Sequence, residues 1–462
     1  MAPEATSAAP ERQPIIEPAT EEVLATVPLS TAAEVDDAVH RAHAAQPEWA
    51  RRSPEARAAA LCELADALAR EEDELARLEA RNVGKPIADA RGEIRTAAAA
   101  FRYYAGGVER LTGSTIPVAG GVDVTFFEPI GLVALITPWN FPLAIAGWKV
   151  APALAAGNSV VLKPSELTPL TALRLGEIAA EALGEDVLRV VNGTGPTVGR
   201  QLVEHPLVGK IGFTGSTAVG REIAATAGAA IKRVSLELGG KSANVIFDDA
   251  DLEAAATAAP GGVFANSGQD CCARSRVLVQ ASVLDEFLEM FEAATRAFVV
   301  GDPLDPETQM GPLISGRQRD RVAGFLDDEV DVVFRGDAPE GAGFWFPPTI
   351  LSVPDPGARV FQEEIFGPVA AITTFEDEAE AIALANSTVY GLSGSIWTRD
   401  GARALRVARA IESGALSINS NSSVRLQTPF GGFRQSGLGR ELGPEAIKEY
   451  TELKNVFIST EP

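Results

Sequence analysis

Hydrophobic positions recur at intervals of three and four between residues 30 and 110. This spacing gives each segment one apolar face and predicts a helical region. Thr31 with Glu34, and Ser53 before Pro54, are typical helix starts, because such residues cap free backbone N–H groups or suit the first turn. We expect the leucines here, with Cys62 among them, to pack inside: Leu61, Leu64, Leu68, Leu75 and Leu78.

From Phe126 onward, short apolar runs alternate with helical stretches such as residues 169–183. A repeated order of strand, helix and strand predicts a doubly wound parallel sheet with helices on both faces. In such sheets ligands bind beyond the carboxyl ends of the strands. The predicted strands are residues 131–136, 159–162, 187–191, 211–213 and 242–247.

A second alternating region runs from about residue 242 to residue 433. It contains predicted strands at 276–280 and 369–375 and predicted helices at 284–298 and 379–385. Two strand-like pieces, residues 113–128 and 450–459, have no helix beside them. They pair either with each other or with another subunit.

Composition and charge narrow the function classes. A chain of 462 residues exceeds one ordinary core, so two or three domains are expected. The 40 basic and 63 acidic residues give a net charge of −23, which argues against a nucleic-acid partner. No apolar run approaches the roughly 20 residues of a membrane helix, so no membrane partner is expected.

Residues 1–14 are rich in Ala, Pro and Glu and lack the basic and apolar regions of a signal peptide, so we expect a disordered lead-in. Cys62, Cys271 and Cys272 form no disulfide framework, which favours a cytoplasmic location. No further histidine and no cysteine clusters along the chain with the three histidines, so no metal site is expected. These histidines are His40, His43 and His205.

Two glycine-rich turns follow predicted strands, where a dinucleotide pyrophosphate would meet backbone N–H groups and a helix start. The turn 193–199 matches the usual spacing poorly, whereas the turn 213–220 opens a helix directly after a strand. Either turn alone is also typical of a plain strand-to-helix connection. Lys163 and Glu166 end another strand, where they either grip ribose hydroxyls or form a surface loop.

Two adjacent cysteines, Cys271 and Cys272, stand in the polar segment Ser-Gly-Gln-Asp-Cys-Cys-Ala at residues 267–273. A lone buried cysteine is usually inert packing, but a pair in a polar, glycine-containing loop favours a reactive thiol. The spacing does not say which of the two reacts. Glu237, beside two glycines, is either a general base or an exposed carboxylate.

Together these segments resemble the NAD(P)-dependent aldehyde dehydrogenase superfamily, and the resemblance runs from about Pro14 to Ser459. Each segment alone is unspecific, but their order matches that of the family. The segments are Thr137-Pro-Trp-Asn-Phe-Pro142, Lys163-Pro-Ser-Glu166, Phe213-Thr-Gly-Ser216, Glu237-Leu-Gly-Gly-Lys241, Gly268-Gln-Asp-Cys271, Glu363-Glu-Ile-Phe-Gly-Pro368 and Pro429-Phe-Gly-Gly432.

The resemblance implies an α/β fold with three parts. Residues 1–110 and 130–238 would form a Rossmann-like dinucleotide-binding domain with a doubly wound parallel sheet. Residues 239–434 would form a second α/β domain that carries the nucleophilic cysteine. Residues 111–129 and 445–462 would form a small β oligomerisation element, and the family implies a homodimer or homotetramer.

The resemblance also assigns roles by position. Cys271 falls on the nucleophile, Asn140 on the oxyanion donor and Glu237 on the general base. Lys163 is implied as a further catalytic residue. Together with Glu166, it also falls on the adenosine-ribose contacts. The other implied cofactor contacts are Ile136, Thr137, Trp139, Ser165, Gly195, Phe213, Gly215, Ser216, Val219, Leu238, Gly239, Glu364 and Phe366.

The implied reaction oxidises a small-molecule aldehyde to a carboxylic acid with reduction of NAD, through a thiohemiacetal and a thioester on Cys271. Glu237 favours hydrolysis of the thioester, since relatives that transfer the acyl group to coenzyme A generally lack this base. Glu166 favours NAD over NADP, because a carboxylate repels a 2′-phosphate. The alternatives are a coenzyme A relative, a binding protein without turnover, and a cysteine esterase or protease.

Three residues concern the substrate. Asp270 either attracts a cationic amino-aldehyde or serves only its own loop, and Cys272 adjoins the nucleophile. Arg425 lies in the segment 419–427, which often lines the substrate tunnel in this family, and argues mildly against a cationic substrate. An amino-aldehyde and other small aliphatic or aromatic aldehydes stay open.

Overall fold

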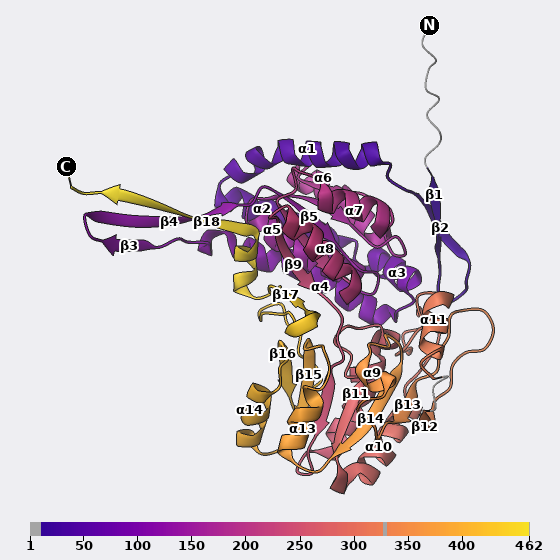
Figure 1. The fold of residues 1–462 in the computed structure, drawn as a ribbon. Coiled ribbons are helices and arrows are strands. Elements are labelled where there is room, and N and C mark those ends of the chain that lie inside the picture. Colours follow the sequence, from indigo (N-terminus) through magenta and orange to yellow (C-terminus); the bar gives the residue numbers. More distant parts are fainter. Residues whose placement is uncertain (1–10, 327–329, 462) are drawn as a thin grey trace.

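The computed structural model describes residues 11–326 and 330–461. Figure 1 shows two α/β bodies and a narrow three-stranded arm that extends from the first of them. Each body is built on one sheet with helices packed on both faces, as the alternating apolar pattern predicts. The chain enters the second body after β9 (Arg233–Glu237) and returns to the first sheet at β17 (Gly437–Leu438).

The first sheet has the order β17-β9-β8-β5-β6-β7, and only β17 runs antiparallel to its neighbour. The chain moves outward from β5 to β7 and then continues with β8 on the other side of β5. This reversal is a topological switch point, where open α/β sheets bind ligands. The remaining strands are β5 (Leu132–Ile136), β6 (Ser159–Lys163), β7 (Leu188–Val190) and β8 (Lys210–Thr214).

Each predicted strand of this sheet is present within one residue at either end. The apolar pattern did not predict the two-residue β17, nor did it predict β9. Its sequence Arg-Val-Ser-Leu-Glu contains only two apolar residues, although its last three positions are buried. A strand that carries polar groups into the interior escapes a search for apolar runs.

Helices cover both faces of the first sheet. The capping box is confirmed, because Thr31 Oγ1 accepts from Glu34 N–H at 3.2 Å and the Glu34 carboxylate accepts from Thr31 N–H at 2.7 Å. Ser53 likewise caps its helix. One face packs against α2 (Pro54–Arg70), α3 (Glu72–Val83), α4 (Ile87–Ala105), α5 (Pro142–Ala155) and α6 (Leu170–Leu183), and the other against α1 (Ala32–Arg51), α7 (Arg200–Glu204) and α8 (Thr217–Ala229).

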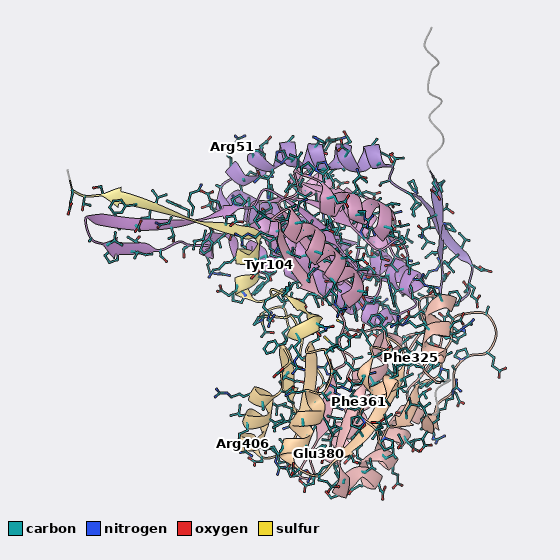
Figure 2. All side chains as sticks on the ribbon, in the orientation of Figure 1. Arg51, Tyr104, Phe325, Phe361, Glu380 and Arg406 are labelled. Carbon is teal, nitrogen blue, oxygen red and sulfur yellow. The ribbon has the colours of Figure 1, made fainter. Side chains whose placement is uncertain are left out.

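The predicted leucines of α2 and α3 are buried, except that Leu78 is half-buried. The prediction for Cys62 is wrong, since this thiol is exposed. One residue advances a helix by about 100°, so Cys62 faces outward although Leu61 faces the core. In Figure 2, Tyr104 lies inside this body, where its hydroxyl donates to Gly443 O at 3.1 Å.

The second sheet has the order β12-β13-β14-β11-β10-β15-β16, and only β12 is antiparallel to its neighbour. The predicted strands at 276–280 and 369–375 are confirmed as β11 (Arg276–Gln280) and β14 (Val369–Phe375). The others are β10 (Ala243–Ile246), β12 (Asp331–Arg335), β13 (Thr349–Ser352), β15 (Ser393–Trp397) and β16 (Ala415–Ile418). The helices are α9 (Leu252–Phe264), α10 (Leu284–Arg296), α11 (Gly316–Ala323), α12 (Arg359–Gln362), α13 (Glu378–Ala385) and α14 (Gly401–Ala410).

The arm consists of β3 (Thr115–Val118), β4 (Gly121–Pro129) and β18 (Thr451–Ser459). The two strand-like pieces of the sequence pair with each other, since β18 is antiparallel to β4 from Thr451 opposite Pro129 to Ser459 opposite Gly121. Figure 1 shows that the arm projects away from both bodies. Large apolar side chains on it are exposed: Ile116, Val118, Phe126, Leu453, Val456, Phe457 and Ile458.

Two terminal segments differ from expectation. Residues 1–10 of the predicted lead-in lie outside the described residues, but Arg12–Ile16 form β1, which pairs with β2 (Val23–Pro28). The turn of this hairpin reaches the second body, where Phe344 N–H donates to Pro18 O at 3.0 Å. Residues 444–450, part of the predicted oligomerisation segment, instead fold as a short helix that packs Ala446 and Ile447 into the first core.

Within the described residues, no helix combines the length and apolarity that a membrane crossing requires.

Candidate active site

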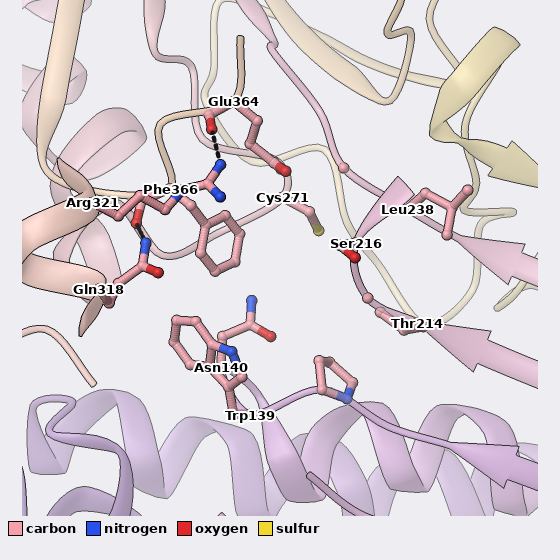
Figure 3. Close-up of a pocket in the computed structure, with 13 residues that line it drawn as sticks. Trp139, Asn140, Thr214, Ser216, Leu238, Cys271, Gln318, Arg321, Glu364 and Phe366 are labelled. Atoms are coloured by element: carbon pink, nitrogen blue, oxygen red, sulfur yellow. Dashed lines mark hydrogen bonds between the residues drawn. The ribbon is translucent and has the colours of Figure 1, made fainter. Parts of the chain in front are cut away.

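A cavity of about 180 Å³ opens between the carboxyl ends of the first sheet and the second body. We name it the Cys271 cavity (Figure 3). Loops after β5 and β8 contribute one wall, and the second body contributes the thiol and Glu364. The predicted site residues that line it are Trp139, Asn140, Gly215, Ser216, Leu238, Gly239, Cys271, Glu364 and Phe366.

The loop before Cys271 has an unusual backbone. Asn266 and Ser267 have φ values of 49° and 58°, a left-handed conformation that costs energy in residues other than glycine. Side chains hold this loop in place: Ser267 Oγ donates to Gly311 O at 2.7 Å, and Gln269 Oε1 accepts from Ile314 N–H at 2.9 Å. Such over-determined strain is concentrated at functional sites.

Gly268 is required by this packing. Its φ is +68°, and a Cβ there would lie 2.1 Å from Gly367 O. The glycine therefore allows the thiol loop and the segment around Gly367 to approach closely.

Cys271 is half-buried, and its thiol points into the cavity. A hydrogen bond with Cys272 and burial raise the pKa of Cys271 well above its ordinary value, and the Asp270 and Glu364 carboxylates add to the effect. Asp270 Oδ1 accepts from Cys272 N–H at 2.9 Å. Of the two interpretations of Asp270, the structure therefore favours the one in which this carboxylate serves its own loop.

Asn140 is buried and fixed by both bodies. Its side-chain amide donates to Gln269 O at 2.9 Å, and its backbone carbonyl accepts from Lys85 Nζ at 2.7 Å and from Asn266 Nδ2 at 3.0 Å. Lys85 is itself buried and ion-paired with Glu93. No motif in the sequence indicates that Lys85 supports Asn140, because Lys85 and Glu93 lie far from Asn140 along the chain.

Glu237 ends β9 and is buried, but its side chain does not line the Cys271 cavity. Neither carboxylate oxygen has a hydrogen-bond partner among the described residues. Burial, and then the nearby Glu441 carboxylate, raise the pKa of Glu237 well above its ordinary value. Lys149, which forms a buried ion pair with Glu441, opposes this shift.

Glu364 and Phe366 approach from the segment after α12. Glu364 Oε1 accepts from Gly240 N–H at 2.9 Å. Burial raises the pKa of Glu364 to about 7, although the hydrogen bond from Gly240 acts in the opposite direction. Phe366 has a φ of 59° and meets the Trp139 ring edge-on, with 5.3 Å between ring centroids. These groups form the side of the cavity opposite β8.

The sequence did not reveal two residues of the same wall, Gln318 and Arg321 of α11. Gln318 Nε2 donates to Phe366 O at 2.8 Å, and Arg321 donates to Glu364 O at 3.1 Å, as Figure 3 shows. Both side chains therefore hold the backbone of predicted site residues. On an exposed, polar helix such residues carry no recognisable pattern.

A second cavity of about 190 Å³ lies between α7 and α8. We name it the α7–α8 slot. Four predicted cofactor contacts line it: Ile136, Gly195, Phe213 and Val219. Ser216, at the start of α8, lines the Cys271 cavity, so the first turn of α8 lies between the two cavities.

Lys163 and Glu166 stand near this slot. The Lys163 chain lies 3.7 Å from a Cβ placed on Gly199, which lines the slot, and its Nζ is 3.6 Å from Glu166 Oε2. Burial lowers the pKa of Lys163. Thr137 and Ser165 lie in the connections after β5 and β6 without lining either cavity.

The predicted substrate contact Arg425 is exposed, and it donates to Ser422 O at 3.1 Å. Its neighbours Val424 and Leu426 pack instead against an apolar cluster with Cys271 and the buried Cys272. Trp148 and Phe430 join this cluster, and their ring centroids are 5.8 Å apart. The packing around the two cysteines on this side is therefore apolar and aromatic, a feature that the sequence did not reveal.

Comparisons with known proteins agree with the geometry. The model of the aldehyde dehydrogenase family matches residues 5–456. Phenylacetaldehyde dehydrogenase of Pseudomonas fluorescens is 43% identical, over 96% of this chain and 92% of that protein. Betaine aldehyde dehydrogenase 1 of Rhizobium meliloti (strain 1021) is 42% identical, over 97% of this chain and 94% of that protein.

Among solved structures, PnpE from Pseudomonas sp. WBC-3 superimposes with a TM-score of 0.95 and 44% identity, over 98% of this chain and 95% of that one. PnpE has also been solved in complex with nicotinamide adenine dinucleotide, with the same TM-score of 0.95. The family match over nearly the whole chain and the shared fold show that this chain belongs to the aldehyde dehydrogenase family.

Proposed function

We propose that this protein oxidises an apolar aldehyde to a carboxylic acid with NAD, through a covalent intermediate on Cys271. One observation carries the proposal: the Cys271 thiol shares one cavity with Asn140, Glu364 and the start of α8. A nucleophile, a hydrogen-bond donor for an oxyanion and a helix N-terminus for a phosphate are the groups that this reaction needs.

The residues present fit a dinucleotide that bridges the two cavities. The α7–α8 slot would take the adenine, Lys163 and Glu166 the adjoining ribose, and the first turn of α8 the pyrophosphate. Two features support this fit. The Thr214 hydroxyl beside the Cys271 cavity is buried without a hydrogen-bond partner among the described residues. A Cβ on Gly239 would come within 2.5 Å of Glu364 Oε2, so glycine leaves that carboxylate room.

Cys271 supplies the nucleophile. Its sulfur adds to the aldehyde carbon, and Asn140 Nδ2 and the Cys271 N–H would donate to the resulting oxygen anion. Loss of one such donor typically costs about 10²–10³ in rate. When bound, NAD supplies the hydride acceptor and a positive charge that favours the thiolate.

Hydrolysis of the Cys271 thioester requires a base. Burial raises the pKa of Glu237, and in its carboxylate form this residue would accept a proton from the attacking water. Overall, one aldehyde, one NAD and one water give one acid, one reduced NAD and one proton. Coenzyme A has no part in this scheme.

The surroundings of Cys271 favour an apolar, preferably aromatic, substrate. Trp148 and Phe430 contribute two rings to the apolar cluster that includes Cys271, and Val424 and Leu426 pack against the same cluster. The Asp270 carboxylate accepts a hydrogen bond within its loop, and Arg425 is the charged residue of the neighbouring segment. The Arg425 charge disfavours a cationic aldehyde.

The arm and the cysteines suggest assembly and location. Exposed apolar side chains on both faces of β18 support a homo-oligomer formed through the arm. Three free cysteines, one of them the nucleophile, favour the reducing cytoplasm.

Absorbance of reduced nicotinamide tests the proposal, with NAD or NADP and without coenzyme A. The panel contains phenylacetaldehyde, a straight-chain aldehyde and betaine aldehyde. NAD reduction that prefers phenylacetaldehyde and disappears in Cys271→Ala supports the proposal. Reduction that requires coenzyme A, or that persists in Cys271→Ala, contradicts the mechanism, and preference for betaine aldehyde contradicts the substrate class.

A further inference from the structure

Away from the Cys271 cavity, the fold brings two of the chain's three histidines to one carboxylate. Asp36 and His40 lie one turn apart on α1, and His205 follows the last residue of α7. His205 Nε2 is 3.1 Å from Asp36 Oδ1, and His40 Nδ1 is 3.3 Å from Asp36 Oδ2. One ligand atom from each residue lies within 4.8 Å of the other two.

We propose that Asp36, His40 and His205 form a binding site for Zn²⁺. Zinc binds imidazole nitrogen and carboxylate oxygen at about 2.0–2.2 Å, which places neighbouring tetrahedral ligand atoms about 3.3 Å apart. The two contacts with Asp36 already match this spacing. His40 is exposed, and its Nδ1 also lies 2.9 Å from the Asp36 backbone oxygen, so the ring would turn away from that contact to complete the third spacing.

His205 is oriented for this role. The residue is 8% exposed, and its Nδ1 accepts from Leu207 N–H at 3.2 Å. Nε2 therefore carries the ring proton and faces Asp36 when no metal is bound. Zinc would replace that proton at Nε2, and the proton would pass to solvent.

The surroundings leave space for a further ligand. The three residues line a surface hollow of about 620 Å³ that also contains Gln201 and Glu204. Three protein ligands leave a fourth tetrahedral position, which a water would fill. Arg200 also lines this hollow, and its Nε lies 3.9 Å from Glu204 Oε1, which forms an ion pair with it.

Spacing along the chain predicted no metal site, because Asp36 and His205 are far apart in sequence. In the fold, α1 and α7 lie against each other, and Gln201 Nε2 donates to Ala32 O at 2.7 Å (Figure 1). Bound zinc would join these helices behind the α7–α8 slot, since Arg200 and Val203 of α7 line that slot. Zinc should therefore stabilise the folded chain by binding it in preference to the unfolded chain.

A competing cluster must be separated from this one. Within the described residues, Asp270, Cys271 and Cys272 also place three ligand atoms within 4.8 Å of one another. The experiment therefore uses the full chain with Cys271→Ser and Cys272→Ser. Zinc affinity is measured by competition with a chromophoric chelator, the thermal midpoint by scanning fluorimetry, and the ligand atoms by X-ray absorption.

We expect one Zn²⁺ per chain, nitrogen and oxygen ligands, and a rise in the thermal midpoint. His40→Ala and Asp36→Asn should each weaken binding at least tenfold, and so should His205→Ala if it folds. His43→Ala is the matched control, because His43 is exposed on the same helix and should leave the affinity unchanged. Binding that survives His40→Ala and Asp36→Asn, or that weakens equally in His43→Ala, would overturn the proposal.

Discussion

The Cys271 cavity and the arm of β3, β4 and β18 are built in opposite ways. Left-handed backbone at Asn266 and Phe366 surrounds the cavity, and the Thr214 hydroxyl in its lining is buried without a hydrogen-bond partner among the described residues. The arm has a regular nine-residue pairing of β18 with β4, but much of its apolar surface is exposed. The first region stores strain and unsatisfied polar groups, and the second leaves apolar area uncovered.

This difference shows what each region still requires. A cavity with unpaired polar atoms is completed by ligand, water or a change of protonation. A regular sheet with exposed apolar residues is completed by another apolar surface, and a second copy of the chain is the simplest source. Substitutions should therefore separate turnover from assembly.

The largest expected effect comes from Cys271→Ala. Removal of the nucleophile should lower the rate of aldehyde oxidation by about 10⁴-fold or more. NAD affinity, oligomeric state and thermal midpoint should stay close to the wild type. Cys62→Ala is the control, because that thiol is exposed far from the cavity and should keep full turnover. Residual activity above one per cent in Cys271→Ala would assign the chemistry to another residue.

Glu237→Gln should lower steady-state turnover by about 10²–10⁴-fold while a first burst of reduced NAD remains. The burst remains because formation of the thioester on Cys271 does not need this base. In the wild type, the raised pKa of Glu237 means that the carboxylate form grows as pH rises, so the hydrolysis rate should increase with pH. Stopped-flow absorbance across pH checks both points, and loss of the burst would place Glu237 in an earlier step.

Leu453→Glu together with Phe457→Glu should abolish assembly with a much smaller effect on the cavity. These side chains are 63% and 52% exposed and lie on one face of β18, where two buried charges would oppose contact with another chain. Light scattering after size exclusion should show a monomer. Ser459→Glu adds charge on the same face without removing apolar area, and it should stay assembled. An unchanged mass in the double variant would contradict assembly through this arm.

The smallest effect concerns coenzyme choice. Glu166→Ser should raise the ratio of NADP to NAD efficiency by about tenfold or less, since a charge contact in water is worth about 1 kcal/mol at 4 Å. The side chain is 34% exposed, which limits the electrostatic effect. Ratios of kcat/KM for the two coenzymes measure this change. Glu181→Ser, on the exposed side of α6, should leave the ratio unaltered.

Apolar runs along the chain locate most strands of the first sheet and the centre of the second. β11 and β14 agree at both ends, because β11 has three consecutive apolar residues between Arg276 and Gln280 and β14 is apolar or β-branched at every position. β9 escaped because Arg233, Ser235 and Glu237 interrupt its apolar pattern. The hairpin of β1 and β2 escaped because its short strands precede the first helix in a polar segment.

The candidate site divides in a similar way. Motifs identified Cys271, Asn140 and Glu364, and the structure places them around one cavity. Lys85, Gln318 and Arg321 donate hydrogen bonds to the backbone carbonyls of Asn140, Phe366 and Glu364, respectively. Every residue has a backbone carbonyl, so such a contact constrains where the accepting residue lies more than which residue it is. No motif therefore marks such supporting residues.

The sequence by itself determined the alternation of strands and helices in both bodies, the family resemblance and the chemistry of the thiol segment. These properties depend on residue types and on spacing over short distances, which the chain carries directly. Tertiary structure alone decided that Asp270 accepts a hydrogen bond from its own loop, that Trp148 and Phe430 join the apolar cluster around Cys271 and Cys272, and that His40 and His205 meet at Asp36. Contacts between distant segments depend on how two sheets and their helices pack, and local spacing does not specify that packing.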